Sequence, residues 1–143
     1  MNISFSIENG DLIIKDFYNN RIIWQGRPLS YSVEDILEHP QTDTCFILFS
    51  KKDGPRLYPS GPMKAFNNLA CVDSHGKPLW IADLPSSGVD FYTRVIWSNN
   101  LQTNMFKVDL NLKENTLVAF SYSGFLVNIY PENGKIIDKL LIK

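Results

Sequence analysis

A turn motif occurs three times in this chain at constant spacing, and this repetition constrains the fold more than any other feature. Each copy joins two apolar runs through a turn that carries a basic residue. The first residues of successive copies lie 57 residues apart in both steps. Self-similarity at long spacing is the signature of a repeat architecture, so we expect equivalent structural units. The three copies are Asp16 to Trp24, Asp73 to Trp80 and Tyr130 to Asp138.

A Phe-Ser pair followed by a glycine accompanies each copy of the motif. Each pair closes a strand-like run, and we expect the three pairs to occupy equivalent positions. The pairs are Phe5-Ser6, Phe49-Ser50 and Phe120-Ser121, and the glycines are Gly10, Gly54 and Gly124.

The hydrophobic periodicity is that of strands. Ile3, Phe5 and Ile7 alternate with polar residues, and an Asn-Gly turn follows them. Eleven or twelve short strands fit the whole chain, which is an all-β pattern. Residues 32–35 also fit a helix capping box, but the repeat favours a strand over Val33 to Leu37.

The repeat unit is shorter than its 57-residue spacing suggests. The spacings between corresponding residues within a repeat differ from one copy to the next. These differences locate two insertions, at 55–68 and at about 98–112. Without them the unit is about 43 residues long and has four strands. That is the size of a β-propeller blade.

The turn segments resemble the blade motif of quinoprotein-type β-propellers, within the quinoprotein-like/WD40-like superfamily, which reads Ala-x-Asp-x-x-Thr-Gly-Lys-x-x-Trp. In this motif Gly or Asn makes a turn with positive φ, and the Trp covers the neighbouring sheet. The copies read Ile14-x-Asp16-x-x-Asn19-Asn20-Arg21-x-x-Trp24, Cys71-x-Asp73-Ser74-His75-Gly76-Lys77-x-x-Trp80 and Asn128-x-Tyr130-x-x-Asn133-Gly134-Lys135-x-x-Asp138.

The resemblance implies an all-β fold of antiparallel, four-stranded, blade-like sheets. Propellers typically have four to eight blades, whereas residues 1–143 hold about two and a half repeats, at 5–24, 33–80 and 89–138. We therefore expect a single domain built as a half-propeller or as a twisted two-sheet arrangement. A homodimer of two half-rings is possible. The family's cofactor enzymes need a complete ring and an adjacent-cysteine disulfide, which Cys45 and Cys71 cannot supply, so we expect no cofactor.

Composition bounds the class of protein. With 143 residues, 44% hydrophobic and 20% charged, the chain is expected to form one soluble domain. A net charge of −1 gives no general attraction to nucleic acid. The first residues lack a secretion signal, and no apolar stretch is long enough to cross a bilayer, so we expect no membrane association and a cytoplasmic location.

No catalytic constellation stands out. The only histidines, His39 and His75, lack the paired spacing of a metal site and are expected on the solvated surface. Cys45 and Cys71 lie in apolar runs and are expected to be core residues. We predict no metal, no catalytic residue and no enzyme activity.

Charge is unevenly distributed and suggests where a partner binds. Residues 28–50 carry four acids and no Lys or Arg, and residues 51–64 carry a net charge of +3. We predict a protein-binding surface in which an acidic face lies beside a basic loop, with loop 55–68 either functional or covering a sheet edge. The candidate residues are Glu34, Asp35, Glu38 and Asp43, with Lys51, Lys52, Arg56, Tyr58 and Lys64.

These features predict a non-enzymatic protein-binding module. The specific hypothesis is a bacterial immunity protein that neutralises a toxin, such as a basic nuclease. One alternative is a structural module that self-associates into a pseudo-propeller dimer. A second is a small sugar-binding or lyase-like enzyme, which would require a pocket holding His39 or His75 beside a carboxylate.

Overall fold

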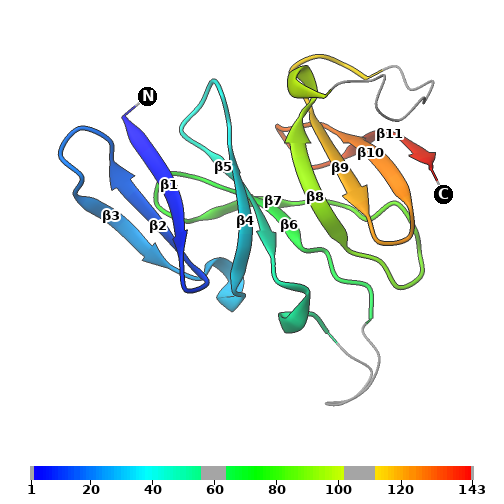
Figure 1. The fold of residues 1–143 in the computed structure, drawn as a ribbon, viewed down its shortest axis with the longest axis horizontal. Helices are drawn as coiled ribbons and strands as arrows, with labels where there is room; N and C mark the ends of the chain where they lie inside the picture. Colours follow the sequence, from blue (N-terminus) through cyan, green and yellow to red (C-terminus); the bar gives the residue numbers. More distant parts are fainter. Residues whose placement is uncertain (1, 56–63, 102–111, 143) are drawn as a thin grey trace.

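The computed structural model describes residues 2–55, 64–101 and 112–142, and these form three antiparallel sheets (Figure 1). The all-β prediction is confirmed. Sheet 1 contains β1 (Ile3–Glu8), β2 (Asp11–Asp16) and β3 (Ile22–Gly26). Sheet 2 contains β4 (Val33–Glu38), β5 (Cys45–Phe49), β6 (Leu69–Val72) and β7 (Pro78–Ile81). Sheet 3 contains β8 (Tyr92–Trp97), β9 (Leu117–Ser121), β10 (Phe125–Ile129) and β11 (Ile136–Leu141).

Each sheet is a simple meander in which neighbouring strands follow one another in the sequence. Val33 to Leu37 is a strand, as the repeat predicted, and not a helix. Within the described residues, the only helical turns are the short 3-10 elements η1 (Pro28–Ser30), η2 (Lys51–Asp53) and η3 (Ser98–Asn100).

Sheet 2 is the middle layer of the molecule. Every residue of β5 and β6 is buried, because the two faces of these strands pack against different sheets. One apolar cluster lies between sheets 1 and 2, and a second lies between sheets 2 and 3. The first is centred on Phe5, Leu12, Ile47 and Phe49, and the second on Phe46, Leu69, Trp97 and Leu117.

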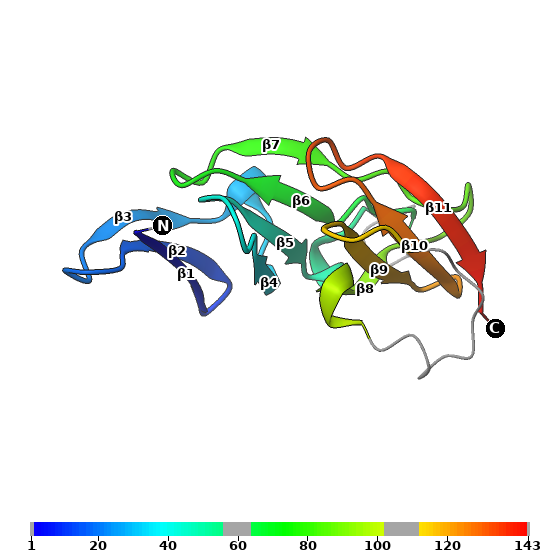
Figure 2. The ribbon, with the colours of Figure 1, turned by 90° about the horizontal axis from the view of Figure 1, so that it is seen from above.

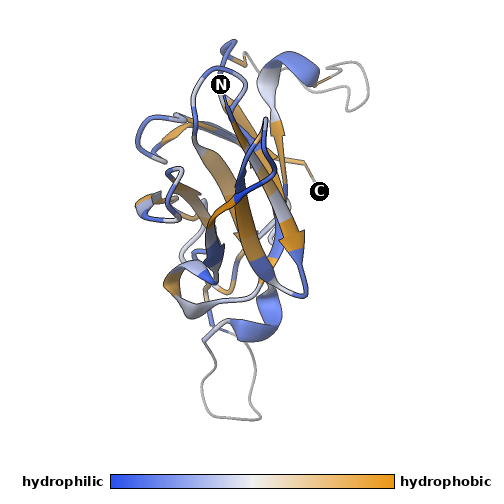
Figure 3. Ribbon diagram, turned by 90° about the vertical axis from the view of Figure 1, so that its left-hand side faces the viewer, coloured by the Kyte–Doolittle hydropathy of each residue, from blue (hydrophilic) through white to orange (hydrophobic). Residues whose placement is uncertain are grey.

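The three sheets fan out in the same order as in the sequence (Figure 2). The edge strands β3, β7 and β11 lie on one side of the fan, and β1, β4 and β8 lie on the other. The described part of sheet 1 has no counterpart of β4 and β8. Hydrophobic residues concentrate in the strands and hydrophilic residues in the turns (Figure 3).

The strand register confirms that the turn motif repeats. Ile14 pairs with Trp24, Cys71 pairs with Trp80, and Asn128 pairs with Asp138. A one-residue register shift follows each of these pairs toward the turn. Such bulges bend a strand and increase its twist, so the outer edges of the three sheets share one local geometry.

The Phe-Ser pairs, in contrast, do not occupy equivalent positions, and that expectation was wrong. Phe5, Phe46 and Val118 are the equivalent residues. They pair with Ile14, Cys71 and Asn128, the residues that on their other side pair with the last position of the turn motif. Phe49 lies three residues beyond Phe46, and Phe120 lies two beyond Val118. The connections explain the difference: β1 turns tightly into β2, whereas β5 runs into η2 and a long connection before β6.

The motif joins each sheet to the next by placing a Trp ring over a turn glycine. Trp24 of sheet 1 covers Gly76 of sheet 2, where an added Cβ would lie 2.6 Å from the ring. Trp80 of sheet 2 covers Gly134 of sheet 3 in the same way. Both glycines have positive φ, 74° and 75°, which only glycine adopts freely. The prediction that the motif Trp covers the neighbouring sheet is confirmed.

Both ends of this series depart from the motif. The first turn has Asn20, with φ 61°, where the other turns have glycine. The third copy has Asp138 where the other two have Trp. A tryptophan ring could not approach the backbone at Asn20 as closely as it does at a glycine, and Asp138 has no ring to supply.

Candidate functional site

The predicted acidic residues share one edge of the molecule. Glu34, Asp35 and Glu38 are exposed on β4, which is the edge strand of sheet 2, and Asp43 is exposed in the loop that follows it. Across residues 2–55, 64–101 and 112–142 the only ion pair joins Arg27 to Asp11. None of the four acids is therefore neutralised by a cation within the described chain.

The backbone arranges these carboxylates along β4. A register shift between Val33 and Asp35 makes Glu34 the extra residue of a β-bulge, and bulges re-aim side chains at sheet edges. Asp35 accepts a hydrogen bond from the N–H of Ile36 at 2.9 Å. Glu38 accepts one from the N–H of Phe5 at 3.3 Å, and so links β4 to sheet 1.

Two of the predicted basic residues lie near one end of β4. Lys51 and Lys52 are exposed in η2, which directly follows β5, and Lys64 is also exposed. Because β4 and β5 are antiparallel, the lysines of η2 lie near Glu34, whereas Asp43 lies at the opposite end. Arg56 and Tyr58, and most of loop 55–68, lie outside the described residues.

A cavity of about 180 Å³ brings two predicted residues of opposite charge together. Glu34 and Lys51 both line it, with Phe91 at its wall. The Lys51 ammonium lies 5.8 Å from the centroid of the Phe91 ring, and Tyr122 stacks on Phe91 at 4.9 Å. Tyr122 is 63% exposed and Phe91 is buried, so Tyr122 presents an aromatic ring to solvent that is backed by Phe91. We call this cavity the edge pocket; Asn68, Tyr92 and Thr93 complete its lining.

Sequence reasoning missed Phe91, Tyr122 and Thr93. One sequence feature bears on Tyr122 and one parallel in strand register bears on Thr93, whereas nothing in the sequence singled out Phe91. Tyr122 follows the third Phe-Ser pair as Lys51 follows the second, and Thr93 is the extra residue of a bulge in β8 as Glu34 is in β4. Neither signal shows that the two positions meet, because that depends on how sheets 2 and 3 pack.

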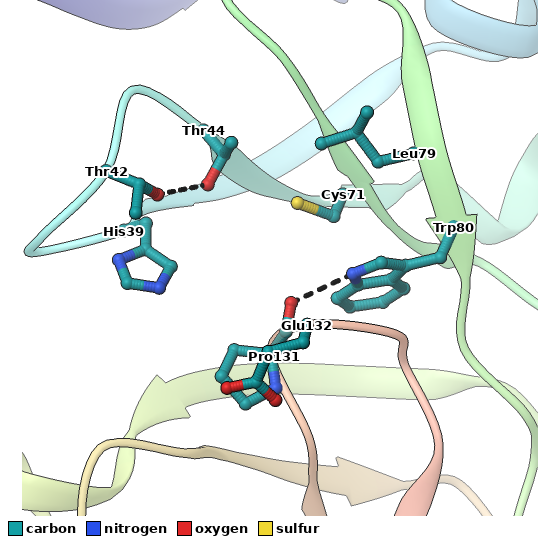
Figure 4. A pocket seen from close by; sticks show the side chains of 8 residues that line it. All are labelled: His39, Thr42, Thr44, Cys71, Leu79, Trp80, Pro131 and Glu132. Atoms are coloured by element: carbon teal, nitrogen blue, oxygen red, sulfur yellow. Dashed lines mark hydrogen bonds between the residues drawn. The ribbon is translucent and has the colours of Figure 1, made fainter.

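A second cavity, of about 210 Å³, lies on the seam between sheets 2 and 3 (Figure 4). We call it the seam pocket. The loop after β4 supplies one wall, β6 and β7 supply the floor, and the turn between β10 and β11 closes the other side. It is lined by His39, Thr42, Thr44, Cys71, Leu79, Trp80, Pro131 and Glu132.

The prediction that both histidines are solvated holds for His75 and is wrong for His39. His75 is exposed in its turn. His39 is half-buried, with its ring 5.0 Å from Trp97 and 5.6 Å from Phe46. Burial lowers the pKa of His39 below 6.5, and the nearby Glu132 carboxylate partly opposes that shift. The aromatic residues of the seam attract the imidazole, and sequence spacing gave no sign of that contact.

The cysteines are core residues, as predicted. Both are free and buried. Burial raises the pKa of Cys71 to about 11, opposed by a hydrogen bond with Thr44, and burial raises the pKa of Cys45 as well. A thiol that stays protonated at neutral pH is a poor nucleophile and a poor metal ligand.

No group of three or more His, Cys, Asp or Glu residues in the described part of the chain could hold a metal ion. In the same part of the chain, no helix has the length and apolar character needed to cross a membrane.

The sequence matches no protein-family model and no curated protein. Among solved structures, the chain is similar to the computationally designed Ika8 protein, at 10% identity and a TM-score of 0.57, over 98% of this chain and 34% of that one. It is also similar to BamB from Moraxella catarrhalis, at 12% identity and a TM-score of 0.48, over 96% of this chain and 35% of that one. The chain thus spans about a third of the length of each. The match to the designed protein, which is propeller-like, supports a propeller-like fold.

Proposed function

We propose that this chain is a non-enzymatic protein-binding module whose partner docks on the acidic edge strand β4. The observation that carries the proposal is the state of the four acids. All four are exposed on one edge, and none forms an ion pair within the described residues. Exposed charges of one sign steer the approach of an oppositely charged partner.

The edge pocket supplies the second property that protein interfaces need. Stable interfaces concentrate binding energy in a few aromatic and cationic anchors near the centre of the buried patch. Tyr122 stacked on Phe91, with Lys51 above the ring, is such a group beside Glu34. We propose that the partner covers this pair while its basic residues engage Glu34, Asp35, Glu38 and Asp43.

The specific form of the proposal is a bacterial, cytoplasmic immunity protein that binds and neutralises a basic toxin. Small size, a rigid all-β scaffold and an acidic binding edge support it. We also propose that the blades derive from the quinoprotein-like superfamily, because the Trp-over-glycine contacts follow that motif. Self-association into a pseudo-propeller is the weaker candidate, since Asn20 and Asp138 interrupt the series of contacts that would extend the array.

The test combines affinity capture from the native host with charge variants. Chain carrying Glu34→Gln, Asp35→Asn and Asp43→Asn should lose most of the captured partner. A control with Asp83→Asn, Glu114→Gln and Asp138→Asn removes the same number of exposed acids elsewhere and should capture it normally. Both proteins should unfold at the same temperature, because all six side chains are exposed.

Measurements on the purified complex then test the role of charge and the immunity form of the proposal. The association rate should fall steeply with added salt if the acids steer binding. Inhibition of a toxic enzyme by stoichiometric amounts of this chain would support the immunity form. Failure to recover any stoichiometric partner, or equal binding by the two triple variants, would refute docking on β4.

A further inference from the structure

The seam pocket has one rigid apolar wall. The indole N–H of Trp80 donates to the carbonyl oxygen of Pro131 at 2.9 Å, and the ring lies against Gly134. Leu79 and Cys71 extend this surface (Figure 4). Because the ring is held at both points, the wall is formed before any ligand arrives, and binding costs little ordering of side chains.

The other sides of the pocket offer acceptors for hydrogen bonds: two threonine hydroxyls in the loop after β4, and the Glu132 carboxylate in the turn between β10 and β11. The hydroxyls of Thr42 and Thr44 lie 2.7 Å apart and share one hydrogen bond, which leaves lone pairs free on both oxygens. Glu132 is exposed, and its carboxylate has no hydrogen-bond or ion-pair partner in the part of the chain that the structure describes. Acceptors therefore outnumber donors on these two sides of the pocket.

His39 is neutral and therefore does not balance the negative charge of Glu132. Its Nδ1 accepts a hydrogen bond from the backbone N–H of Gln41 at 3.0 Å, which assigns the proton of the neutral ring to Nε2. Burial against Trp97 and Phe46 favours this neutral form, in keeping with the lowered pKa of the imidazole. The pocket thus carries the single negative charge of Glu132.

We propose that the seam pocket binds an aliphatic ammonium group, of the kind found at the end of a lysine side chain or on a free alkylamine. The stem lies on Leu79 and Trp80, and the ammonium meets the two threonine hydroxyls, while the Glu132 carboxylate on the other side of the pocket supplies the opposite charge. An ammonium has three donors and no acceptor, which matches a lining in which acceptors predominate. The volume of about 210 Å³ corresponds to roughly seven water molecules at about 30 Å³ each, which is room enough for a four-carbon stem and its nitrogen.

This site is independent of the acidic edge strand. Its lining includes none of Glu34, Asp35, Glu38 or Asp43. The proposal can therefore fail while docking on β4 stands, and the reverse also holds.

The experiment is a titration of the whole chain followed by nuclear magnetic resonance. The indole N–H of Trp80, assigned with a Trp80→Phe variant, reports on the pocket, and the indole of Trp24 serves as the reference. n-Butylammonium chloride should shift the Trp80 signal saturably, whereas uncharged n-butanol should bind at least about tenfold more weakly, as loss of a charge-assisted hydrogen bond predicts. N-acetyl-lysine-N-methylamide separates the two sources: if it binds as well as butylammonium, the pocket accepts a lysine side chain, and if it does not, the pocket accepts free amines alone.

Two charge variants complete the test. Glu132→Gln should weaken butylammonium binding about tenfold, and Glu114→Gln, an exposed acid in a different turn, should leave it unchanged. Equal thermal unfolding of both variants shows that they fold. No saturable shift, equal binding of butylammonium and butanol, or full binding by Glu132→Gln would each overturn the proposal.

Discussion

The indole ring of Trp80 lies directly over the α-carbon of Gly134, and its N–H donates to the Pro131 carbonyl in the same turn. Trp24 stands over Gly76 in the same relationship one sheet earlier. The two contacts join sheet 1 to sheet 2 and sheet 2 to sheet 3. Each contact needs a glycine twice over, for its positive φ and for the absence of a Cβ.

Gly76→Ala and Gly134→Ala should therefore destabilise the fold. A methyl group at either site overlaps a tryptophan ring and places alanine in a left-handed conformation. We expect a loss of roughly 1–3 kcal/mol from overpacking, and about 1 kcal/mol more from the backbone. Urea unfolding followed by circular dichroism measures it. Gly88→Ala is the matched control, because nothing lies within 4 Å of its added Cβ, and a similar loss there would contradict this account.

Restoring the motif at both ends should make the chain self-associate. Asn20→Gly opens a socket on sheet 1, and Asp138→Trp supplies a ring on sheet 3, so that one chain can dock on the next. Light scattering at high micromolar concentration should show a larger mass for the double variant than for the unaltered chain. Asp138→Trp alone has no glycine socket to meet. If it associates to the same extent, the gain comes from an exposed Trp and not from the motif.

Asp90 should be essential to the packing of sheet 3. This buried carboxylate accepts hydrogen bonds from the N–H of Phe91 and Ser123, each at 3.0 Å, and from the hydroxyls of Ser86 and Ser123. Asp90→Ala leaves these donors without an acceptor, which should cost roughly 2–4 kcal/mol. Chemical denaturation gives the value. The exposed Asp83 offers a control, and Asp83→Ala should change stability by no more than about 0.5 kcal/mol.

The cysteines should resist thiol reagents in the folded protein. Both thiols are buried, and the pKa of each is raised, that of Cys71 to about 11. Ellman's reagent at pH 8 should label neither residue within the time in which it labels both in denaturant. Rapid labelling of Cys71 without denaturant would mean that the seam pocket opens far more readily than its packing suggests.

The imidazole of His39 should titrate below its ordinary pKa of 6.5. Burial against Trp97 and Phe46 disfavours the charged ring, and Glu132 partly compensates. The unfolded chain then binds more protons than the folded chain between the two pKa values. The contribution of His39 to stability is thus complete above pH 6.5 and declines as the pH falls below it.

An NMR titration of the imidazole resonances measures this pKa. Glu132→Gln should lower it further, because the compensating charge is removed. A His39 pKa above 6.5 would contradict the burial argument.

Local patterns in the sequence predicted the architecture well. The turn motif specified three equivalent hairpins, because its residue with positive φ, present in every copy, acts within a few residues. Asp73 acts over the same short range: its carboxylate accepts hydrogen bonds from the N–H groups of His75 and Lys77 inside the turn. The repeat also placed Glu34 and Asp35 on one strand, and the structure extends that strand by one residue to Glu38.

The cavities could not be predicted in this way. The edge pocket needs Lys51 from η2, which follows sheet 2 strand β5, and Phe91 from the residue just before β8. The seam pocket needs His39 and Glu132, which are 93 residues apart. These residues meet only through the angle between packed sheets. The Phe-Ser pairs were wrongly expected at equivalent positions for a related reason. The position of a strand's last residues depends on the connection that follows, and these connections differ between the sheets.

The position of sheet 2 has a consequence for how the molecule comes apart. It supplies the glycine of one contact and the tryptophan of the other, and both faces of β5 and β6 are covered. If sheet 1 or sheet 3 detaches, the two remaining sheets keep one Trp-over-glycine contact between them. If sheet 2 unfolds, both contacts are lost and neither flanking sheet stays docked. Opening should therefore proceed inward from the flanks, and the amides of β5 and β6 should be the last to exchange with solvent.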